Sequence, residues 1–194
     1  MSTISKVYEC SVDENICQGD VFRNVKYRYI DYEDNEKVEM IEFTFPLAII
    51  ISQACDVLSM GEMIMNSKGK ATKFMPSILM TPIYECSMAK NAKHLDEAFE
   101  YLNICKDDNE KTLFTGKDLD VVRKDWHYRY HSFKAMKGEN VVLDDSIIDF
   151  KHYFSVPASY LVENRQNRVF RVDDLFAEQI TLKFATYLSR VAIP

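Results

Sequence analysis

The sequence predicts an α+β fold in which a strand-rich first half is followed by helices and shorter strands. Three observations lead to this prediction. Residues 38–45 alternate apolar and polar side chains, residues 47–51 are apolar at every position, and an apolar stripe with helical spacing lies near the end of the chain. Period-two alternation is typical of a half-buried strand, and recurrence at three and four residues is typical of an amphipathic helix. The stripe consists of Phe176, Ile180, Phe184, Tyr187, Leu188 and Val191.

In the first half, residues 21–30 and 38–45 predict two antiparallel strands joined through Asp34-Asn35. Pro46 should end the second of these strands, and the apolar run 47–51 predicts a strand buried on both faces. Residues 61–73 contain many small and polar side chains and predict a mobile loop. Residues 77–84 return to strand character, and Pro82 within them predicts an edge strand or a bulge.

In the second half, the pattern predicts an amphipathic helix over 94–105, a short helix over 118–125 and a strand over 128–133. A strand over 147–156, a short helix over 158–163 and a strand over 168–172 follow. Asp173 or Asp174 should cap the final helix. Because no repeat or linker divides the chain, we expect one domain over 1–194. It would have a strand-rich core at 18–86 and an extension at 87–194 that packs on it.

The composition limits the function classes. The chain has 194 residues, of which 47% are hydrophobic, and a net charge of −6, which disfavours a dedicated nucleic-acid binder without excluding a local basic patch. No apolar run approaches the roughly 18 residues that span a bilayer, and the first ten residues are polar, so we expect a cytoplasmic protein without a membrane segment. The five cysteines are irregularly spaced without a CxxC pair, so we expect reduced thiols and neither a metal nor another cofactor.

Three segments in order resemble the SH3-like β-barrel of the PemK/MazF toxin family. They are Gly19-Asp20-Val21-Phe22, the apolar segment 46–52 and the segment 77–83 that contains Pro82-Ile83. The resemblance implies an SH3-like barrel over 18–86 with the C-terminal α/β extension. It also implies a partner, either a second copy of the chain or another protein, because barrels of this family dimerise.

The PemK/MazF family consists of ribosome-independent endoribonucleases, and the resemblance implies where their chemistry would lie. An arginine should precede Pro46, and a hydroxyl residue should follow Ile83. Phe45 and Tyr84 stand at these positions. Phe45 cannot stabilise charge on a phosphate, so we expect no inherited ribonuclease chemistry. Segments 51–56, 149–157 and 184–194 also resemble uncharacterised bacterial proteins with an SQ-x-CD signature, which suggests a prokaryotic or phage source.

The sequence therefore predicts a protein-interaction or regulatory component of a defence or toxin–antitoxin-like system. Two alternatives remain open. One is a divergent endoribonuclease that recruits Arg123, Arg129 or His131, and the other is a thiol-dependent hydrolase.

Cys55 and Asp56 are the candidate nucleophile and its neighbour, because they follow a predicted buried strand directly. His127 and His131 are the candidate bases. Alternatively, Cys55 packs as a small apolar residue and Asp56 caps the next turn. Together with Cys86 these groups have the donor types of a zinc site, but the sequence does not show that they converge.

The candidate binding residues lie in two places besides Tyr84. Trp126, Tyr128 and Arg129 belong to a run of aromatic and cationic residues that could stack bases and contact phosphates. Alternatively, Trp126, Tyr128 and Tyr130 share one strand face and are core or partly buried residues. Lys68 and Lys70, near Lys73, lie in the predicted loop and could contact RNA, or could simply be solvated.

Overall fold

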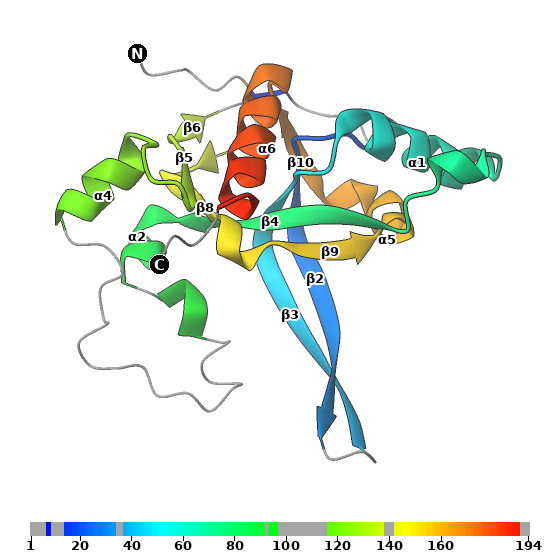
Figure 1. Ribbon diagram of the computed structural model, residues 1–194, viewed down its shortest axis with the longest axis horizontal. Helices are drawn as coiled ribbons and strands as arrows, with labels where there is room; N and C mark the ends of the chain where they lie inside the picture. The colour runs from blue at the N-terminus through cyan, green and yellow to red at the C-terminus, as the bar shows by residue number, and fades with distance from the viewer. Residues whose placement is uncertain are drawn as a thin grey trace.

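The computed structural model describes residues 7–8, 14–33, 37–91, 93–96, 116–137 and 142–190. Figure 1 shows the arrangement of the elements. The strands are β1 (Val7–Tyr8), β2 (Asp20–Glu33), β3 (Lys37–Ile50), β4 (Ser77–Glu85), β5 (Tyr130–Phe133), β6 (Met136–Lys137), β7 (Val142–Leu143), β8 (Ser146–Asp149), β9 (Phe154–Pro157) and β10 (Arg168–Val172). The α-helices are α1 (Ala54–Asn66), α2 (Cys86–Lys90), α4 (Gly116–Arg123), α5 (Ala158–Glu163) and α6 (Asp174–Leu188). The 3-10 turns are η1 (Ala71–Lys73), η2 (Lys93–Leu95), η4 (Phe150–His152) and η5 (Arg165–Asn167).

One antiparallel sheet contains most of the strands, in the order β1-β10-β2-β3-β4-β8-β5, with β9 also paired to β4. This confirms the predicted α+β class. Among the described strands, no ladder joins β1 to β5, so the described sheet is open, and the predicted closure into an SH3-like barrel is not found. In the described part of the chain, no helix is both long and apolar enough to cross a membrane.

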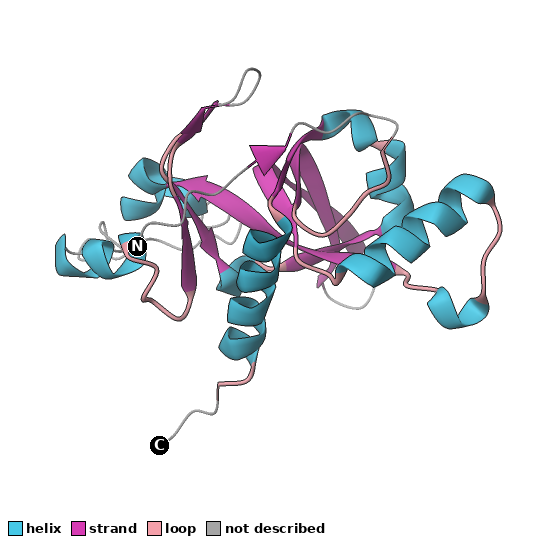
Figure 2. Cartoon of the chain, turned by 90° about the horizontal axis from the view of Figure 1, so that it is seen from above, coloured by secondary structure: helices cyan, strands magenta, loops and turns pink. Residues whose placement is uncertain are grey.

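Both faces of the central strands are buried. Val21 and Ile49 point into a core cluster that includes Phe176 and Ile180 of α6. Their chain neighbours Phe22 and Ile50 point into a second cluster, which includes side chains of α1 and α5. Figures 1 and 2 show α6 well apart from α1 and α5. Because helices cover both faces, residues 48–51 of the predicted 47–51 run are buried, as the uninterrupted apolar pattern predicts. Leu47 is only partly buried and packs against the first cluster.

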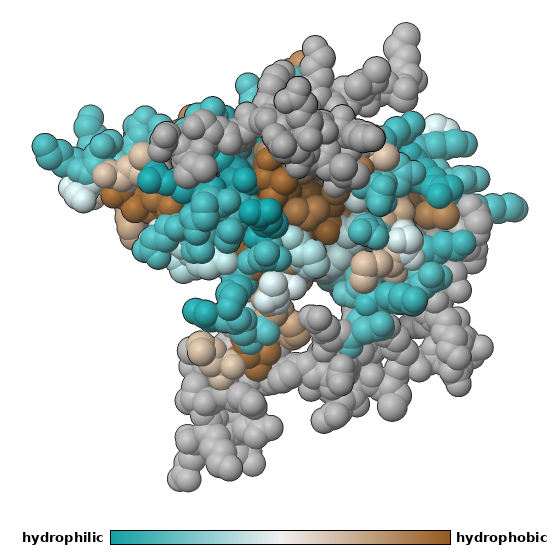
Figure 3. Space-filling model, turned by 180° about the vertical axis from the view of Figure 1, so that it is seen from behind, coloured by the Kyte–Doolittle hydropathy of each residue, from teal (hydrophilic) through white to brown (hydrophobic). Residues whose placement is uncertain are grey.

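The strands β2 and β3 form a long hairpin that projects from the rest of the protein (Figure 1). Seen from behind, its surface carries both hydrophilic and hydrophobic residues (Figure 3). The prediction that Pro46 ends a strand is wrong, because β3 continues to Ile50. The paired register passes from Arg23↔Leu47 to Val25↔Phe45 and omits Asn24, which has a φ of 53°. The missing N–H of Pro46 thus falls where no ladder pair is made.

The strand β4 lies inside the sheet, so the edge position predicted from Pro82 is wrong. Pro82 pairs with Ala48 at the last position of the β3 ladder, and the β8 ladder begins at the next residue, Ile83. Pro82 therefore lies where the pairing of β4 with β3 ends and directly before its pairing with β8 begins.

The predicted strand over 147–156 is interrupted. In the β8 ladder Ile148 faces Ile83, so its continuation would set Lys151 opposite Met80. Phe154 of β9 occupies that position instead, three residues further along the chain. The three residues of η4 are thus inserted between two ladders on β4.

The remaining predictions differ in outcome. The strand β10 and the helix α5 have the predicted bounds, and Asp173 caps α6 by accepting a hydrogen bond from the Leu175 N–H. The mobile loop predicted over 61–73 is wrong, since α1 extends to Asn66 and η1 covers Ala71–Lys73. The helix predicted over 94–105 lies mostly outside the described residues, as does the turn at Asp34-Asn35.

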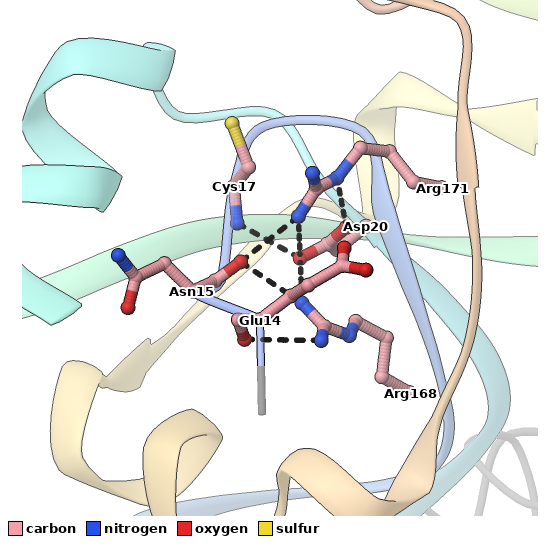
Figure 4. Close-up of polar contacts among 6 residues, drawn as sticks. All are labelled: Glu14, Asn15, Cys17, Asp20, Arg168 and Arg171. Carbon is pink, nitrogen blue, oxygen red and sulfur yellow. Dashed lines mark hydrogen bonds and ion pairs between the residues drawn. The ribbon is translucent and has the colours of Figure 1, made fainter. Parts of the chain in front are cut away.

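Gly19 and Asp20 connect the start of β2 to its neighbour in the sheet, β10, which comes near the end of the chain. Gly19 has a φ of +82°, and a Cβ there would lie 2.9 Å from atoms of both Ala177 and Val172, so only glycine fits. The Asp20 carboxylate accepts hydrogen bonds from Arg168 and Arg171 of β10, at distances of 2.6–3.2 Å. Figure 4 shows this cluster, in which backbone groups of Glu14, Asn15 and Cys17 supply the further partners. The Gly-Asp pair therefore has a structural role in this chain.

Candidate functional site

A cavity of about 530 Å³ lies between the base of the β2–β3 hairpin and the end of β4. Aromatic side chains form much of its lining, among them Tyr27, Phe43, Phe45, Tyr153 and Phe154. Phe45 and Tyr84, which stand where the PemK/MazF resemblance implies catalytic groups, both line this cavity. The two positions are therefore brought together, although the residue types differ from those of the family.

Tyr84 lies at the edge of a small core cluster, and its hydroxyl group lies 3.1 Å from His152 Nδ1. Burial, with a contribution from the Asp149 charge, raises the pKa of Tyr84, so the phenol stays protonated. Burial lowers the pKa of His152; the Asp149 charge opposes this, and Arg129 and Lys151 add to it. A protonated phenol beside a neutral imidazole fits a tautomer in which Tyr84 donates to Nδ1 and Nε2 carries the hydrogen.

Asp149 is the carboxylate on the other side of His152, and its side chain has no exposed surface. Its Oδ2 lies 3.6 Å from His152 Nε2, which is longer than a hydrogen bond. Arg129 donates from Nε and from one terminal nitrogen to the two carboxylate oxygens, at 2.7 and 2.5 Å. Oδ1 also accepts the Lys151 N–H at the start of η4. The insertion η4 thus holds Asp149 and His152 on one side of the chain, because residues three apart eclipse in a 3-10 turn.

His94 of η2 completes the group. Its ring centroid lies 4.5 Å from that of Tyr84 and 5.9 Å from that of His152. His94 and Lys93 both line the cavity. Ligand atoms of His94, Asp149 and His152 all lie within 4.8 Å of one another, so these three side chains could hold a metal ion.

Cys55 and the predicted bases lie in different parts of the protein. Cys55 and Asp56 are exposed in the first turn of α1, with the thiol 3.6 Å from the neighbouring carboxylate. His131 lies on β5, which is far from α1 in both Figure 1 and Figure 2. His131 Nδ1 lies 3.1 Å from Asp125 Oδ2, and its ring packs against Phe176. The structure therefore does not bring Cys55 and the predicted histidine bases together.

The aromatic run 126–131 is only partly buried. The alternative of one shared strand face is wrong, because β5 begins only at Tyr130. Tyr130 is buried, whereas Trp126 and Tyr128 are 74% and 48% exposed. Lys124 Nζ lies 5.1 Å from the centre of the Trp126 ring, and the Arg190 guanidinium lies 3.6 Å from that of Tyr128. His127 stacks on Tyr128, and its Nδ1 accepts the Arg129 N–H.

The predicted binding lysines lie apart from the cavity. Lys68 and Lys70, with Lys73, line a shallow hollow beside the end of α1. All three side chains are exposed. The cavity and this hollow share no lining residue.

Sequence reasoning identified Tyr84 and Arg129 but missed His94 and His152 and did not connect Asp149 with them. The segment 149–157 was predicted to lie mostly within a strand and resembles bacterial proteins. In the predicted extended strand Asp149 and His152 would point to opposite faces, so the sequence did not predict that they lie close together. The Asp-x-x-His spacing within an interrupted alternating pattern was the available signal. No protein-family profile, curated protein or solved structure matches this chain.

Proposed function

We propose that this protein binds single-stranded RNA in the aromatic cavity and cleaves it through Tyr84, His152 and His94. The observation that carries the proposal is the row of phenol, imidazole and carboxylate formed by Tyr84, His152 and Asp149 at a cavity that His94 also lines. The row has the hydroxyl–histidine–acid order that moves protons in many hydrolytic sites. This chemistry needs no arginine before Pro46, so it is compatible with Phe45.

In the proposed reaction the ribose 2′-oxygen attacks the adjacent phosphorus, a P–O2′ bond forms and the P–O5′ bond breaks. Tyr84 accepts the 2′-hydroxyl proton while its own proton passes to His152 Nδ1, and Asp149 stabilises the resulting imidazolium. Protonated His94 donates a proton to the departing O5′. The products are a 2′,3′-cyclic phosphate and a 5′-hydroxyl end, and the step requires neither an oxidant nor another reactant.

The surroundings of the cavity support a nucleic-acid ligand. Aromatic side chains such as Phe43 and Phe45 offer faces on which bases stack without sequence preference. Lys93 offers a cation to phosphate in the same cavity. The exposed Trp126 and Tyr128, each beside a cation, provide a further stacking surface elsewhere on the chain.

Cleavage of a labelled oligoribonucleotide in the presence of EDTA tests the proposal. We expect Tyr84→Phe to lower the rate by about 10²- to 10⁴-fold, the usual contribution of a general acid–base group. Tyr153→Phe is the matched control, because Tyr153 lines the same cavity, and its rate should stay unchanged. The corresponding oligodeoxyribonucleotide should remain intact because it has no 2′-hydroxyl. An uncut RNA, or a fully active Tyr84→Phe variant, would contradict the proposal.

The projecting hairpin favours a second role, as an interaction component of a prokaryotic defence or toxin–antitoxin-like system. Beyond Phe22, β2 pairs with no described strand except β3, so part of its edge can accept an added strand. A second copy of the chain is the simplest partner. Sedimentation should then show twice the 22.6 kDa chain mass at micromolar concentration. A species at the single-chain mass throughout would exclude the homodimer.

A further inference from the structure

We propose that His94, Asp149 and His152 form a binding site for one divalent transition-metal ion of the Zn²⁺ class. The ligand atoms of all three lie within 4.8 Å of one another. His152 Nε2 and Asp149 Oδ2 are 3.6 Å apart. Two ligands bound tetrahedrally at about 2.1 Å from an ion lie about 3.4 Å from each other, so this pair is already spaced to share one.

The groups behind the ligands also suit a metal ion. A histidine that binds metal through one nitrogen usually donates a hydrogen bond from the other, which fixes the ring. Tyr84 can accept this bond from His152 Nδ1, leaving Nε2 free to face Asp149. The Lys151 N–H and Arg129 hold the Asp149 carboxylate in place. The site therefore has outer partners for two of its three ligands.

The donor set selects the kind of ion. Two imidazoles and one carboxylate suit Zn²⁺, Co²⁺ or Ni²⁺, whereas Mg²⁺ and Ca²⁺ require mainly oxygen ligands. The positive charge of Arg129, 2.5 Å from Asp149 Oδ2, opposes a second cation and should moderate the affinity. Three protein ligands leave a tetrahedral ion one further position for water or a ligand.

Binding would regulate the proposed ribonuclease, and this consequence rests on the proposed function. An ion on His152 Nε2 keeps the ring hydrogen on Nδ1, the atom that must accept the Tyr84 proton, and an ion on His94 occupies the lone pair that would carry its proton. Zn²⁺ should therefore inhibit RNA cleavage, and a chelator should restore it.

Titration of the EDTA-treated full-length chain with Co²⁺ tests the site without RNA. We expect one ion per chain and a visible absorption band without the near-ultraviolet charge-transfer band of a thiolate ligand. His94→Ala and His152→Ala should each weaken the affinity at least about 10-fold, while the matched control His127→Ala should leave it unchanged. Circular dichroism of each variant shows whether it remains folded. If His152→Ala does not, His152→Gln replaces it, and His94→Gln replaces His94→Ala in the same way.

Three results would overturn the site: no stoichiometric binding, a thiolate band, or an affinity that neither histidine variant changes. Binding of Co²⁺ by a chain that does not cleave RNA would support the metal site and contradict the ribonuclease proposal. Cleavage of RNA by a chain that does not bind Co²⁺ would support the ribonuclease proposal and contradict the metal site.

Discussion

Asp20 and Asp149 are both buried carboxylates that accept two hydrogen bonds from one arginine, but their surroundings differ. Around Asp20, a second arginine and the backbone of the preceding segment supply the other partners (Figure 4). Around Asp149, the neighbours are His152 and, through it, a cavity. An ion pair enclosed by the main chain holds segments together, whereas one beside a histidine and a cavity can also take part in chemistry.

The largest expected effect is on stability, at Asp20. Asp20→Ala leaves the buried Arg168 guanidinium and the partly buried Arg171 guanidinium without their carboxylate, so the free energy of unfolding should fall by about 3–5 kcal/mol. Urea unfolding followed by circular dichroism measures this change. Glu42→Gln, which removes an exposed partner of Lys26 and Arg28, should lower the free energy of unfolding far less, because exposed ion pairs are screened by solvent. Similar losses for both variants would show that the Asp20 cluster is not a structural anchor.

Asp149→Asn should separate stability from activity. The variant keeps an oxygen for the Lys151 N–H, and Arg129 retains some exposure, so the unfolding free energy should fall by only about 1–3 kcal/mol. The kcat for RNA cleavage should fall by about 100-fold with little change in KM, because Asp149 positions His152 and stabilises its charge. Steady-state kinetics measure the two constants. If only stability changed, Asp149 would be no different in kind from Asp20.

A third carboxylate, Asp125, provides a pH-dependent comparison. Burial raises its pKa, but the hydrogen bonds and charges of His131 and Lys183 outweigh this and hold the pKa below its ordinary value. The stabilisation is therefore present above the unfolded-state pKa of about 3.9 and is lost as the pH falls through the lower folded-state pKa. The difference in unfolding free energy between wild type and Asp125→Asn should shrink below about pH 4. Asp120→Asn, at an exposed position on α4, is the control variant.

The smallest effect is expected at Cys55. Cys55→Ser should change the unfolding free energy by less than about 0.5 kcal/mol and leave RNA cleavage unchanged, because the thiol is exposed on α1. Iodoacetamide should modify Cys55 before Cys86, since burial and the Asp145 charge raise the pKa of the Cys86 thiol to about 11. If Cys55→Ser lost RNA cleavage, the residues that cleave RNA would include Cys55 on α1. The proposed difference in role between Asp149 and Asp20 would then lose its support.

The sequence predicted the fold well where one local pattern decides the structure. The apolar run before Ile51, the helix α5 and the capped helix α6 follow from periodicity and capping alone. The prediction failed where pairing between distant segments decides the structure. Pro82 is tolerated where the β3 ladder ends and the β8 ladder begins. The helix α1 continues through Gly61, where a Cβ would lie 3.2 Å from a side-chain atom of Ile16.

The candidate site was less predictable for the same reason. Tyr84 was identified because a resemblance marks its position, and Arg129 because it lies among aromatic residues. His94 and His152 are far apart in the sequence and are joined only by the way η2 and η4 meet the cavity. No spacing rule links residues from separate turns, so their convergence required the fold.

The turn η4 is a short insertion that carries part of the candidate site and that the sheet itself does not require. It adds three residues between two ladders on β4, and both ladders keep their partners on either side of it. A relative that lost these three residues could retain a continuous sheet. It would lose His152 and the Lys151 N–H that donates to the Asp149 carboxylate. Proteins that share this architecture can therefore be sorted by one short insertion, and those without it should lack the proposed Tyr84–His152–Asp149 row.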